Sequence, residues 1–459
     1  MKNIIITVIN DLVTDQRVHR MAGTLVRQGY RVQLVGRKLP GSLPVESLFP
    51  LVSKDPAPPA GAADIFNVAG PVDPGTPADA ADAVVPVDPG TPADVADAVV
   101  PEDAGASVDA VDVAGPVDPG ASVDAVDVAG PVDPGMFRIK RFRMLFKRGP
   151  LFYAFYNLRL FFFLLFRRRP VMLVSVDLDT LAAGYLVSKL RNIPLLYDSH
   201  EYFTEVPELV DRPLVKRTWE RIEGMIVSRL RAGIAVSDSI AEVYREKYGV
   251  EFRTIRNVPV SMNPGVFPEL RDAYPSAYKL IYQGALNRGR GIELMIEAMR
   301  YIPDVLLFVV GDGDVRTTLQ AMVHRLKLTD RVVFPGRIPP RRLAGLTAQC
   351  DLGFSLEEDL GLNYRMALPN KIFDYIQARV PVLCSDLPEM AALVEQYGVG
   401  EVCGERSPQA LAGQVREILK NVEKRNRWKE QLDKAARELC WEREEQQLVV
   451  LMDELLGKG

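Results

Sequence analysis

Short runs of apolar and β-branched residues alternate with helical patterns along most of this chain, and this alternation constrains the fold most strongly. Strands that alternate with helices form parallel sheets with helices on both faces. The first series predicts strands at 3–9, 31–36, 171–176, 193–197, 234–237 and 252–256. The second series predicts strands at 280–283, 305–310, 332–334, 352–355 and 382–384. The pattern therefore predicts an α/β chain with two Rossmann-like domains.

The length of 459 residues also exceeds what one ordinary hydrophobic core occupies. We expect an N-terminal domain at 1–258 and a C-terminal domain at 259–435, which begins with a proline-marked linker. The chain reads as helix from Pro408 almost to its end, so 436–459 are expected to form a helix able to pack back on the N-terminal domain.

An acidic repeat interrupts the first domain. VDPGTPADAADAVVP at 72–86 recurs with one change, and GASVDAVDVAGPVDP at 105–119 recurs identically. Residues 55–135 carry 16 acidic residues and no Lys or Arg, and the Pro, Gly, Ala, Val and Asp of the repeats supply few large apolar groups. Such a composition cannot offset its ordering entropy, so we predict a disordered insertion at 55–135.

The next segment, 136–170, is basic and aromatic. It contains ten Lys and Arg and no acid, with Phe, Tyr and Leu between the basic clusters. Its apolar part, 151–166, contains Asn157 and Arg159 and is too short and polar to span a bilayer. The composition favours a membrane-proximal helix at an anionic surface. The alternative is a core helix of the N-terminal domain with a solvated basic rim.

Two weaker signals in the sequence indicate the cellular compartment. Cys350, Cys384, Cys403 and Cys440 are scattered without metal-ligand spacing, as in reduced proteins. The N-terminus MKNIIITVIN lacks the pattern of a signal peptide. We expect a cytoplasmic protein, peripheral on the inner face of the cell membrane if the basic segment binds lipid.

Ligands of parallel α/β sheets bind beyond the carboxyl ends of the strands, so residues that follow strands are candidate site residues. In the first series, IPLLYDSHEYF places Asp198, His200 and Glu201 there. In the second, IYQGALNRGRGIE supplies Gly284 and a glycine-rich turn with Arg288 and Arg290, whose backbone and guanidinium groups suit a diphosphate.

Two further turns follow strands of the second series. LLFVVGDGD supplies Gly311, Asp312 and Gly313, where missing side chains let the backbone approach a ligand. VVFPGRIPP supplies Arg337 and Ile338, whose backbone amides could contact a base.

The stretch LPNKIFDYIQARVPVLCS opens a helix with Asn370, Lys371 and Asp374 near its start. Lys371 and Asp374 are three residues apart and share one helix face. A cation and a carboxylate in the first turn suit a phosphorylated sugar. The alternative is a surface ion pair that contributes a few tenths of a kcal/mol.

Together these turns resemble the family 4 glycosyltransferases of the GT-B fold, most clearly from about 278 to 404. The resemblance implies two domains that face each other across a cleft, and transfer of a sugar from a nucleotide diphosphate sugar with retention of configuration. It implies that Arg290, with Arg288, and Lys371 bind the donor diphosphate, that Asp374 binds the ribose, and that His200 faces the reacting sugar.

The motif departs from the family pattern at some positions. The first glutamate of the family's E-x7-E pattern falls on Met366, so the resemblance leaves Asn363 or Tyr364 to contact the donor sugar. The glycine-rich acceptor loop after the first strand is replaced by NDLVTDQRVHR. We expect no cofactor and no metal, because no Asp-x-Asp site is placed to hold one on the diphosphate. The expected partners are a glycan or lipid-linked acceptor and an anionic membrane, not nucleic acid.

Two other functions remain open from the sequence. A nucleotide-sugar 2-epimerase shares this architecture but needs acid and base groups, of which only His200 is evident. A non-catalytic membrane scaffold would not need Arg290, Lys371 and Asp374. A dinucleotide-dependent dehydrogenase is disfavoured, because no G-x-G-x-x-G follows the first strand.

Overall fold

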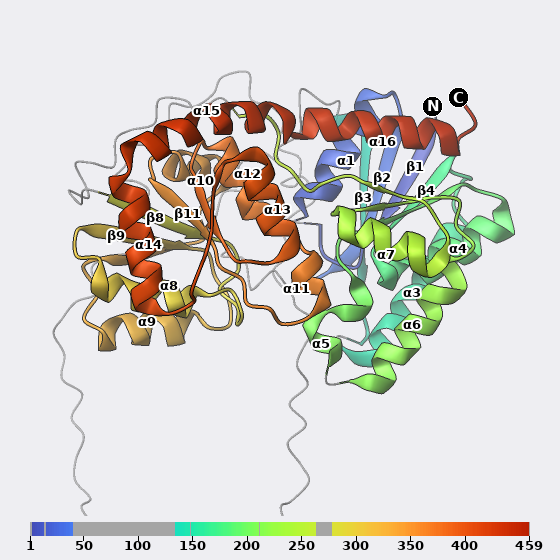
Figure 1. Ribbon diagram of the computed structural model, residues 1–459. Helices are drawn as coiled ribbons and strands as arrows, with labels where there is room; N and C mark the ends of the chain where they lie inside the picture. Colours follow the sequence, from blue (N-terminus) through green and yellow to red (C-terminus); the bar gives the residue numbers. More distant parts are fainter. Residues whose placement is uncertain are drawn as a thin grey trace, which may run out of the picture.

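The computed structural model describes residues 2–12, 15–39, 134–146, 148–210, 212–262 and 278–458. Over these residues the chain forms two α/β domains that lie side by side (Figure 1). The repeat predicted to be disordered at 55–135 lies outside the described residues except for its last two positions.

The first domain is built on a seven-stranded parallel sheet with the order β3-β2-β1-β4-β5-β6-β7. Its strands are β1 (Asn3–Thr7), β2 (Arg31–Lys38), β3 (Phe137–Arg143), β4 (Met172–Val176), β5 (Leu195–Ser199), β6 (Gly233–Ala235) and β7 (Phe252–Thr254). Its helices are α1 (Gln16–Arg27), α3 (Gly149–Leu165), α4 (Leu178–Arg191), α5 (Pro207–Val210), α6 (Pro213–Val227) and α7 (Asp238–Tyr248).

The second domain has a six-stranded parallel sheet with the order β10-β9-β8-β11-β12-β13. Its strands are β8 (Tyr278–Gln283), β9 (Val305–Val310), β10 (Val332–Gly336), β11 (Leu352–Ser355), β12 (Val382–Cys384) and β13 (Gly400–Val402). Its helices are α8 (Ile292–Ala298), α9 (Arg316–Arg325), α10 (Pro340–Thr347), α11 (Leu362–Met366), α12 (Asn370–Gln377), α13 (Pro388–Tyr397), α14 (Pro408–Lys420) and α15 (Val422–Glu438).

Local sequence explains where these elements begin and end. All six residues of β9, VLLFVV, are buried, as expected for a strand covered on both faces. The side chains of Asp15, Ser237 and Ser407 accept hydrogen bonds from the first-turn amides of α1, α7 and α14. Gly249 ends α7 in the left-handed conformation that glycine adopts without strain.

The last helix, α16 (Trp441–Leu455), lies on the first domain, and Figure 1 shows α15 and α16 running from one domain to the other. Trp441 is fully buried in the core of the first domain, and its indole Nε1 donates to Thr24 Oγ1 at 3.0 Å. Leu448 and Met452 join the same core. The C-terminal helix therefore ties the two domains together through buried apolar contacts.

The basic segment 136–170 differs from its predicted structure. Its first part forms β3, in which basic and apolar residues alternate, as on an edge strand with one exposed face. Its second part forms α3, whose residues Phe152, Tyr156, Leu160 and Leu164 are buried in the first domain. One face of α3 thus belongs to the core of the first domain, and the strand was missed. Whether the exposed basic side contacts a membrane or only solvent stays a prediction.

Other differences from the prediction are small. β5 begins and ends two residues later than the predicted strand at 193–197. Asp198 therefore lies within the strand, and His200 directly follows it. The three-residue β13 was not predicted, because it is too short to show a period. Among the described residues, no helix has both the length and the apolar character needed to cross a membrane.

Candidate functional site

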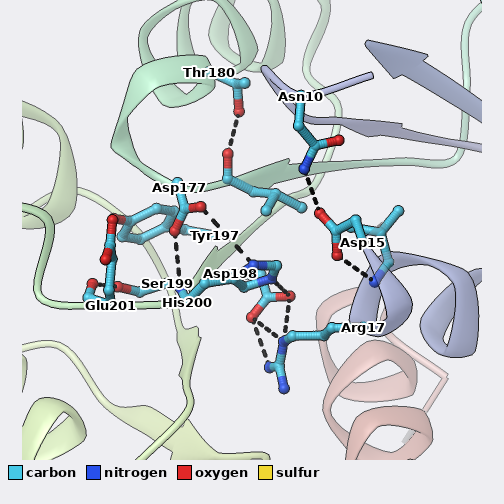
Figure 2. Close-up of polar contacts among 12 residues, drawn as sticks. Asn10, Asp15, Arg17, Asp177, Thr180, Tyr197, Asp198, Ser199, His200 and Glu201 are labelled. Atoms are coloured by element: carbon cyan, nitrogen blue, oxygen red, sulfur yellow. Dashed lines mark hydrogen bonds and ion pairs between the residues drawn. The ribbon is translucent and has the colours of Figure 1, made fainter. Parts of the chain in front are cut away.

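His200 lies at the carboxyl end of the first sheet, where β5 ends, and Figure 2 shows its contacts. Its ring nitrogen Nε2 is 3.1 Å from Asp198 Oδ2. Its backbone amide donates to Asp177 Oδ1 at 2.9 Å, and the ring Nδ1 is 3.9 Å from Asp177 Oδ2. Two carboxylates therefore fix the orientation of the imidazole.

Asp198 is in turn held by Arg17 of α1. The Arg17 guanidinium donates through Nε at 3.0 Å and through Nη2 at 2.7 Å to the two carboxylate oxygens (Figure 2). Nη1 donates to the Ile255 carbonyl at 2.6 Å. The side chains of Arg17 and Asp198 are 1% and 0% exposed. A fully desolvated, doubly hydrogen-bonded pair thus anchors His200 to the core.

The charges around His200 determine its protonation. Burial alone would lower the pKa of His200, but the carboxylates of Asp198 and Asp177 outweigh it and raise the pKa to about 9. Burial opposes ionisation of Asp198, but Arg17 and His200 hold its pKa well below the usual range. At neutral pH the site therefore presents an imidazolium that is paired with an ionised carboxylate.

In the second domain, glycine backbones line the ends of three neighbouring strands. The Gly284 amide donates to Val310 O at 3.0 Å, and the Gly311 amide donates to Gly336 O at 2.9 Å. A Cβ at Gly311, whose φ is +139°, would lie 1.9 Å from the Gly284 carbonyl oxygen. Only glycine fits this approach, so the predicted glycine turns are packed against one another.

Lys371 is buried at the start of α12, with 7% of its surface exposed. Its Nζ donates to Glu357 Oε1 at 2.6 Å and lies 4.2 Å from the centre of the Tyr282 ring. The opposite oxygen of Glu357 accepts from Ser355 Oγ at 2.8 Å. The surface ion pair between Lys371 and Asp374 considered from the sequence is wrong, because Lys371 is buried and its ammonium group pairs with Glu357.

Arg290 approaches the same carboxylate, with Nη1 3.7 Å from Glu357 Oε1. Its guanidinium also lies 5.7 Å from the centre of the Tyr364 ring. Burial favours the protonated form of Glu357, but the charges of Lys371 and Arg290 outweigh it and lower its pKa. Two cations therefore converge on one buried anion. They leave a net positive charge beside Gly284, where an added Cβ would lie 3.9 Å from Lys371 Nζ.

Asp374 lies one turn further along α12 and accepts from Gln283 Nε2 at 3.0 Å. Gln283 is the last residue of β8, and its Oε1 accepts from Thr347 Oγ1 at 2.8 Å. Asp374 thus lies beside the end of β8, immediately before the Gly284 turn. Its predicted role, binding the donor ribose, stays a prediction.

The remaining donor-site candidates lie at the rim of this edge. Asp312 Oδ1 accepts from the Gly313 amide at 2.9 Å, and its Oδ2 is 3.7 Å from Arg337 Nε. Ile338 packs against the domain core. Arg288 and Asn370 are exposed, and neither converges on Glu357. Of the predicted cations, the structure therefore brings together Arg290 and Lys371 and leaves Arg288 apart.

Asn363 of α11 joins the two domains. Its side-chain Oδ1 accepts from the Tyr202 amide at 3.0 Å, and its Nδ2 is 3.5 Å from Glu201 Oε2. Nearby, Ser237 Oγ donates to Met366 O at 2.7 Å. Burial lowers the pKa of Arg290, but the charge of Glu357 raises it above its usual value. The charge of Glu201, from the first domain, adds a smaller contribution in the same direction. The strand ends that carry His200 and Arg290 therefore face each other.

Sequence reasoning missed three residues of this site: Arg17, Asp177 and Glu357. Asp177 follows β4 directly, and Glu357 comes two residues after β11. Both satisfy the rule that site residues follow strands, so that rule could have found them. Arg17 lies in NDLVTDQRVHR, the segment that stands in place of the expected acceptor loop, and no local pattern marks its pairing with Asp198.

Comparison with known proteins agrees with this arrangement. Residues 269–435 match the family described as glycosyl transferases group 1. This part of the chain is thus similar to the group 1 glycosyltransferases. The 2-deoxystreptamine glucosyltransferase of Streptomyces kanamyceticus is 25% identical over 294 residues, which cover 56% of this chain and 69% of that protein.

Solved structures show that the described residues of the two domains have the GT-B fold. A sucrose-phosphate synthase from Thermosynechococcus elongatus superposes with a TM-score of 0.67 at 15% identity, covering 100% of both chains. Anabaena HepE in complex with UDP superposes with a TM-score of 0.64 at 14% identity, covering 99% of this chain and 100% of the other. The predicted two-domain architecture is confirmed.

Proposed function

We propose that this protein transfers a hexose from a nucleotide diphosphate sugar to an acceptor, with retention of anomeric configuration. The observation that carries the proposal is the convergence of Lys371 and Arg290 at the strand ends that face His200. A diphosphate leaving group needs cations where its charge develops, and in this proposal Lys371 and Arg290 supply them. The UDP complex of HepE, which has the same fold, is consistent with a nucleotide donor.

The proposed chemistry divides between the two domains. Lys371 and Arg290 stabilise negative charge on the departing diphosphate. Asp374 binds the ribose and Asn370 a phosphate, both from α12. The glycine turns at 284 and 311–313 let the donor approach the backbone. The His200 imidazolium donates a hydrogen bond to the sugar. Contact between the domains through Asn363 excludes water that would otherwise hydrolyse the donor.

Retention requires that the acceptor attacks from the face on which the diphosphate leaves. In this proposal no protein nucleophile takes part. The bond between the anomeric carbon and the diphosphate oxygen breaks, and the anomeric carbon forms a bond to the acceptor oxygen on the same face. The departing phosphate oxygen accepts the proton of the acceptor hydroxyl. The role of the protein is then electrostatic and positional, which agrees with a site dominated by paired charges.

The acceptor is proposed to be a lipid-linked or cell-surface polysaccharide precursor, reached at the inner face of the cell membrane. The support is the abundance of basic and apolar side chains in 136–170. No metal is required in this account, because Lys371 and Arg290 supply the positive charge at the diphosphate.

The test is to incubate the protein with uridine and guanosine diphosphate sugars and a membrane extract that contains lipid-linked acceptors. Release of the nucleoside diphosphate that depends on the acceptor, with a product anomer identical to that of the donor by nuclear magnetic resonance, is expected. Conversion of a donor to its 2-epimer without acceptor would instead establish the epimerase function. Binding of the donor without turnover under any condition would favour a scaffold.

A further inference from the structure

The outer face of α3 and α4 carries a concentration of exposed apolar side chains. Leu158, Phe162 and Phe166 of the α3 region are 54%, 48% and 80% exposed, and they follow one another at intervals of four residues. Leu186 and Leu190 of α4 are 51% and 66% exposed and have the same spacing. Because α3 and α4 pack together, these side chains form two adjacent stripes, which we call the α3–α4 face.

The apolar stripes do not replace the buried face of α3. Phe152, Tyr156, Leu160 and Leu164 point into the core of the first domain, so α3 is apolar on two sides. A helix that is apolar all round is normally covered on both sides. Figure 1 shows α3 and α4 on the side of the first domain away from α16. Nothing in the described residues covers their outer side chains, which points to an external partner.

The charged side chains that α3, α4 and their connection place beside these stripes have one sign. Arg159, Arg167, Arg168, Arg169 and Lys189 are exposed beside them. The only acids between 148 and 191 are Asp177 and Asp179, which belong to the strand end near His200 and do not lie on the outer face. The Arg159 guanidinium lies 5.0 Å from the Phe142 ring centre and Arg167 4.4 Å from that of Phe163, so cations stand directly over aromatic rings.

We propose that the α3–α4 face docks on an anionic lipid surface, with the leucine and phenylalanine side chains inserted among the acyl chains and the cations at the phosphates. Charge complementarity selects this occupant: apolar insertion and adjacent cations are the two signals that stable peripheral binding requires. A second copy of this chain is disfavoured, because a two-fold contact would bring the same cations against each other.

The α3–α4 face extends from one edge of the first sheet to the other, and its link to a lipid-linked acceptor rests on the proposed function. The strands of the first sheet are parallel, so the end of β3, where the chain turns into α3, lies at the same sheet edge as His200. Leu145 and Phe146, which follow β3, are exposed there. Arg167, Arg168 and Arg169 lie between the end of α3 and the start of β4, at the opposite edge of the sheet, so only the beginning of α3 lies on the side of His200.

The experiment is sedimentation of the full chain with vesicles of phosphatidylcholine alone or mixed equally with phosphatidylglycerol. Binding to the mixed vesicles only is expected. The double variant Arg168→Glu/Arg169→Glu should weaken that binding at least about tenfold, whereas the matched variant Arg416→Glu/Arg427→Glu, which changes exposed arginines of α14 and α15, should not. Equal loss in both pairs, or binding to both kinds of vesicle, would overturn the proposal.

The apolar stripe is tested in the same way with Leu158→Ser/Phe162→Ser and its control Val422→Ser/Val450→Ser, which changes exposed side chains on α15 and α16. Only the first pair should lower vesicle binding, again by about tenfold or more. Light scattering should show that parent and variant are monomers; a dimer that the first pair dissociates would assign the face to a second copy. Donor binding by the same variants should be unchanged. Vesicle sedimentation therefore tests the docking proposal, and donor binding tests the transferase proposal independently.

Discussion

Lys371 and Glu357 form a buried ion pair, with Nζ and Oε1 2.6 Å apart, at the edge of the second sheet that faces the first domain. Arg290 stands 3.7 Å from the same oxygen. The cations proposed to bind the donor diphosphate are thus held by an internal counter-ion before any donor arrives. This relationship changes what substitution of either residue should do.

Lys371→Met should reduce transfer about ten- to a hundredfold or more, because a charge-assisted contact to the diphosphate contributes about 1.5–3 kcal/mol. The single variant also leaves Glu357 buried without its closest partner, so a loss of stability is expected with it. The double variant Lys371→Met/Glu357→Gln removes both charges and separates the two effects. Steady-state kinetics and urea unfolding should show recovered stability but no recovered transfer. Recovery of transfer in the double variant would argue against contact between Lys371 and the donor.

Glu357→Gln should affect binding and catalysis in opposite directions. It removes the negative charge between two cations and keeps an oxygen that accepts from Lys371, so inorganic diphosphate should bind more tightly. The cations are then less firmly positioned, and kcat should fall. Calorimetry with diphosphate and initial-rate kinetics measure the two effects. Weaker diphosphate binding would show that Glu357 does more than balance charge.

His200 should make stability depend on pH. Its pKa of about 9 in the folded protein exceeds the unfolded value of 6.5. The stabilisation is therefore complete below pH 6.5 and is lost as the pH rises to about 9, with a total on the order of 3 kcal/mol. Urea unfolding of the parent between these limits should show the decline, and His200→Gln should flatten it. An equal decline in the variant would assign the effect to other groups.

Arg17→Met should destabilise the first domain strongly, because it leaves the carboxylate of Asp198 buried without its doubly hydrogen-bonded partner. Loss of one member of a buried ion pair costs about 3–5 kcal/mol. Arg17→Met/Asp198→Asn should recover part of this loss, as measured by the urea midpoint. Arg27→Met, which removes a partly exposed partner of Glu445, is the matched control and should cost much less.

Chelation should leave transfer intact, since the proposed site uses Lys371 and Arg290 as the positive charges at the diphosphate. Activity measured in the presence of a strong chelator, after dialysis against it, is expected to equal that of untreated protein. Inactivation that magnesium or manganese reverses would require a metal on the diphosphate.

The fold was largely predictable because its signal is repeated. Runs such as VLLFVV at 305–310 are apolar on every residue, which only a strand covered on both faces requires. β3 was missed because its alternating basic residues, on an edge strand, resemble a membrane-facing segment. Apolar residues of α3 occur on both its buried side and its exposed side. The composition of 136–170 therefore does not tell a core helix from a helix at a membrane surface.

The site was predictable only where its residues follow a strand or begin a helix. His200 and Arg290 follow strands β5 and β8, whereas Lys371 was found from the start of a helix, and the structure brings the two domains together through Asn363. The pairing of Arg17 with Asp198 joins residues 181 positions apart, and Glu357 is distinguished from the neighbouring Glu358 only by its burial. The strand-end rule therefore offers Glu357 only as one of two adjacent glutamates, and the contact between Arg17 and Asp198 leaves no local pattern for sequence reasoning to detect.

The central claim is that Lys371 and Arg290 bind the diphosphate of a nucleotide sugar, and thermal unfolding with uridine and guanosine diphosphates tests it most directly. A ligand at about 100 times its dissociation constant stabilises a protein by about 2.7 kcal/mol. One of these nucleotides should raise the unfolding temperature of the parent, and the triple variant Arg290→Ala/Lys371→Met/Glu357→Gln should show no shift at the same concentration. An equal shift in parent and variant, or no shift of the parent with either nucleotide, would contradict the account.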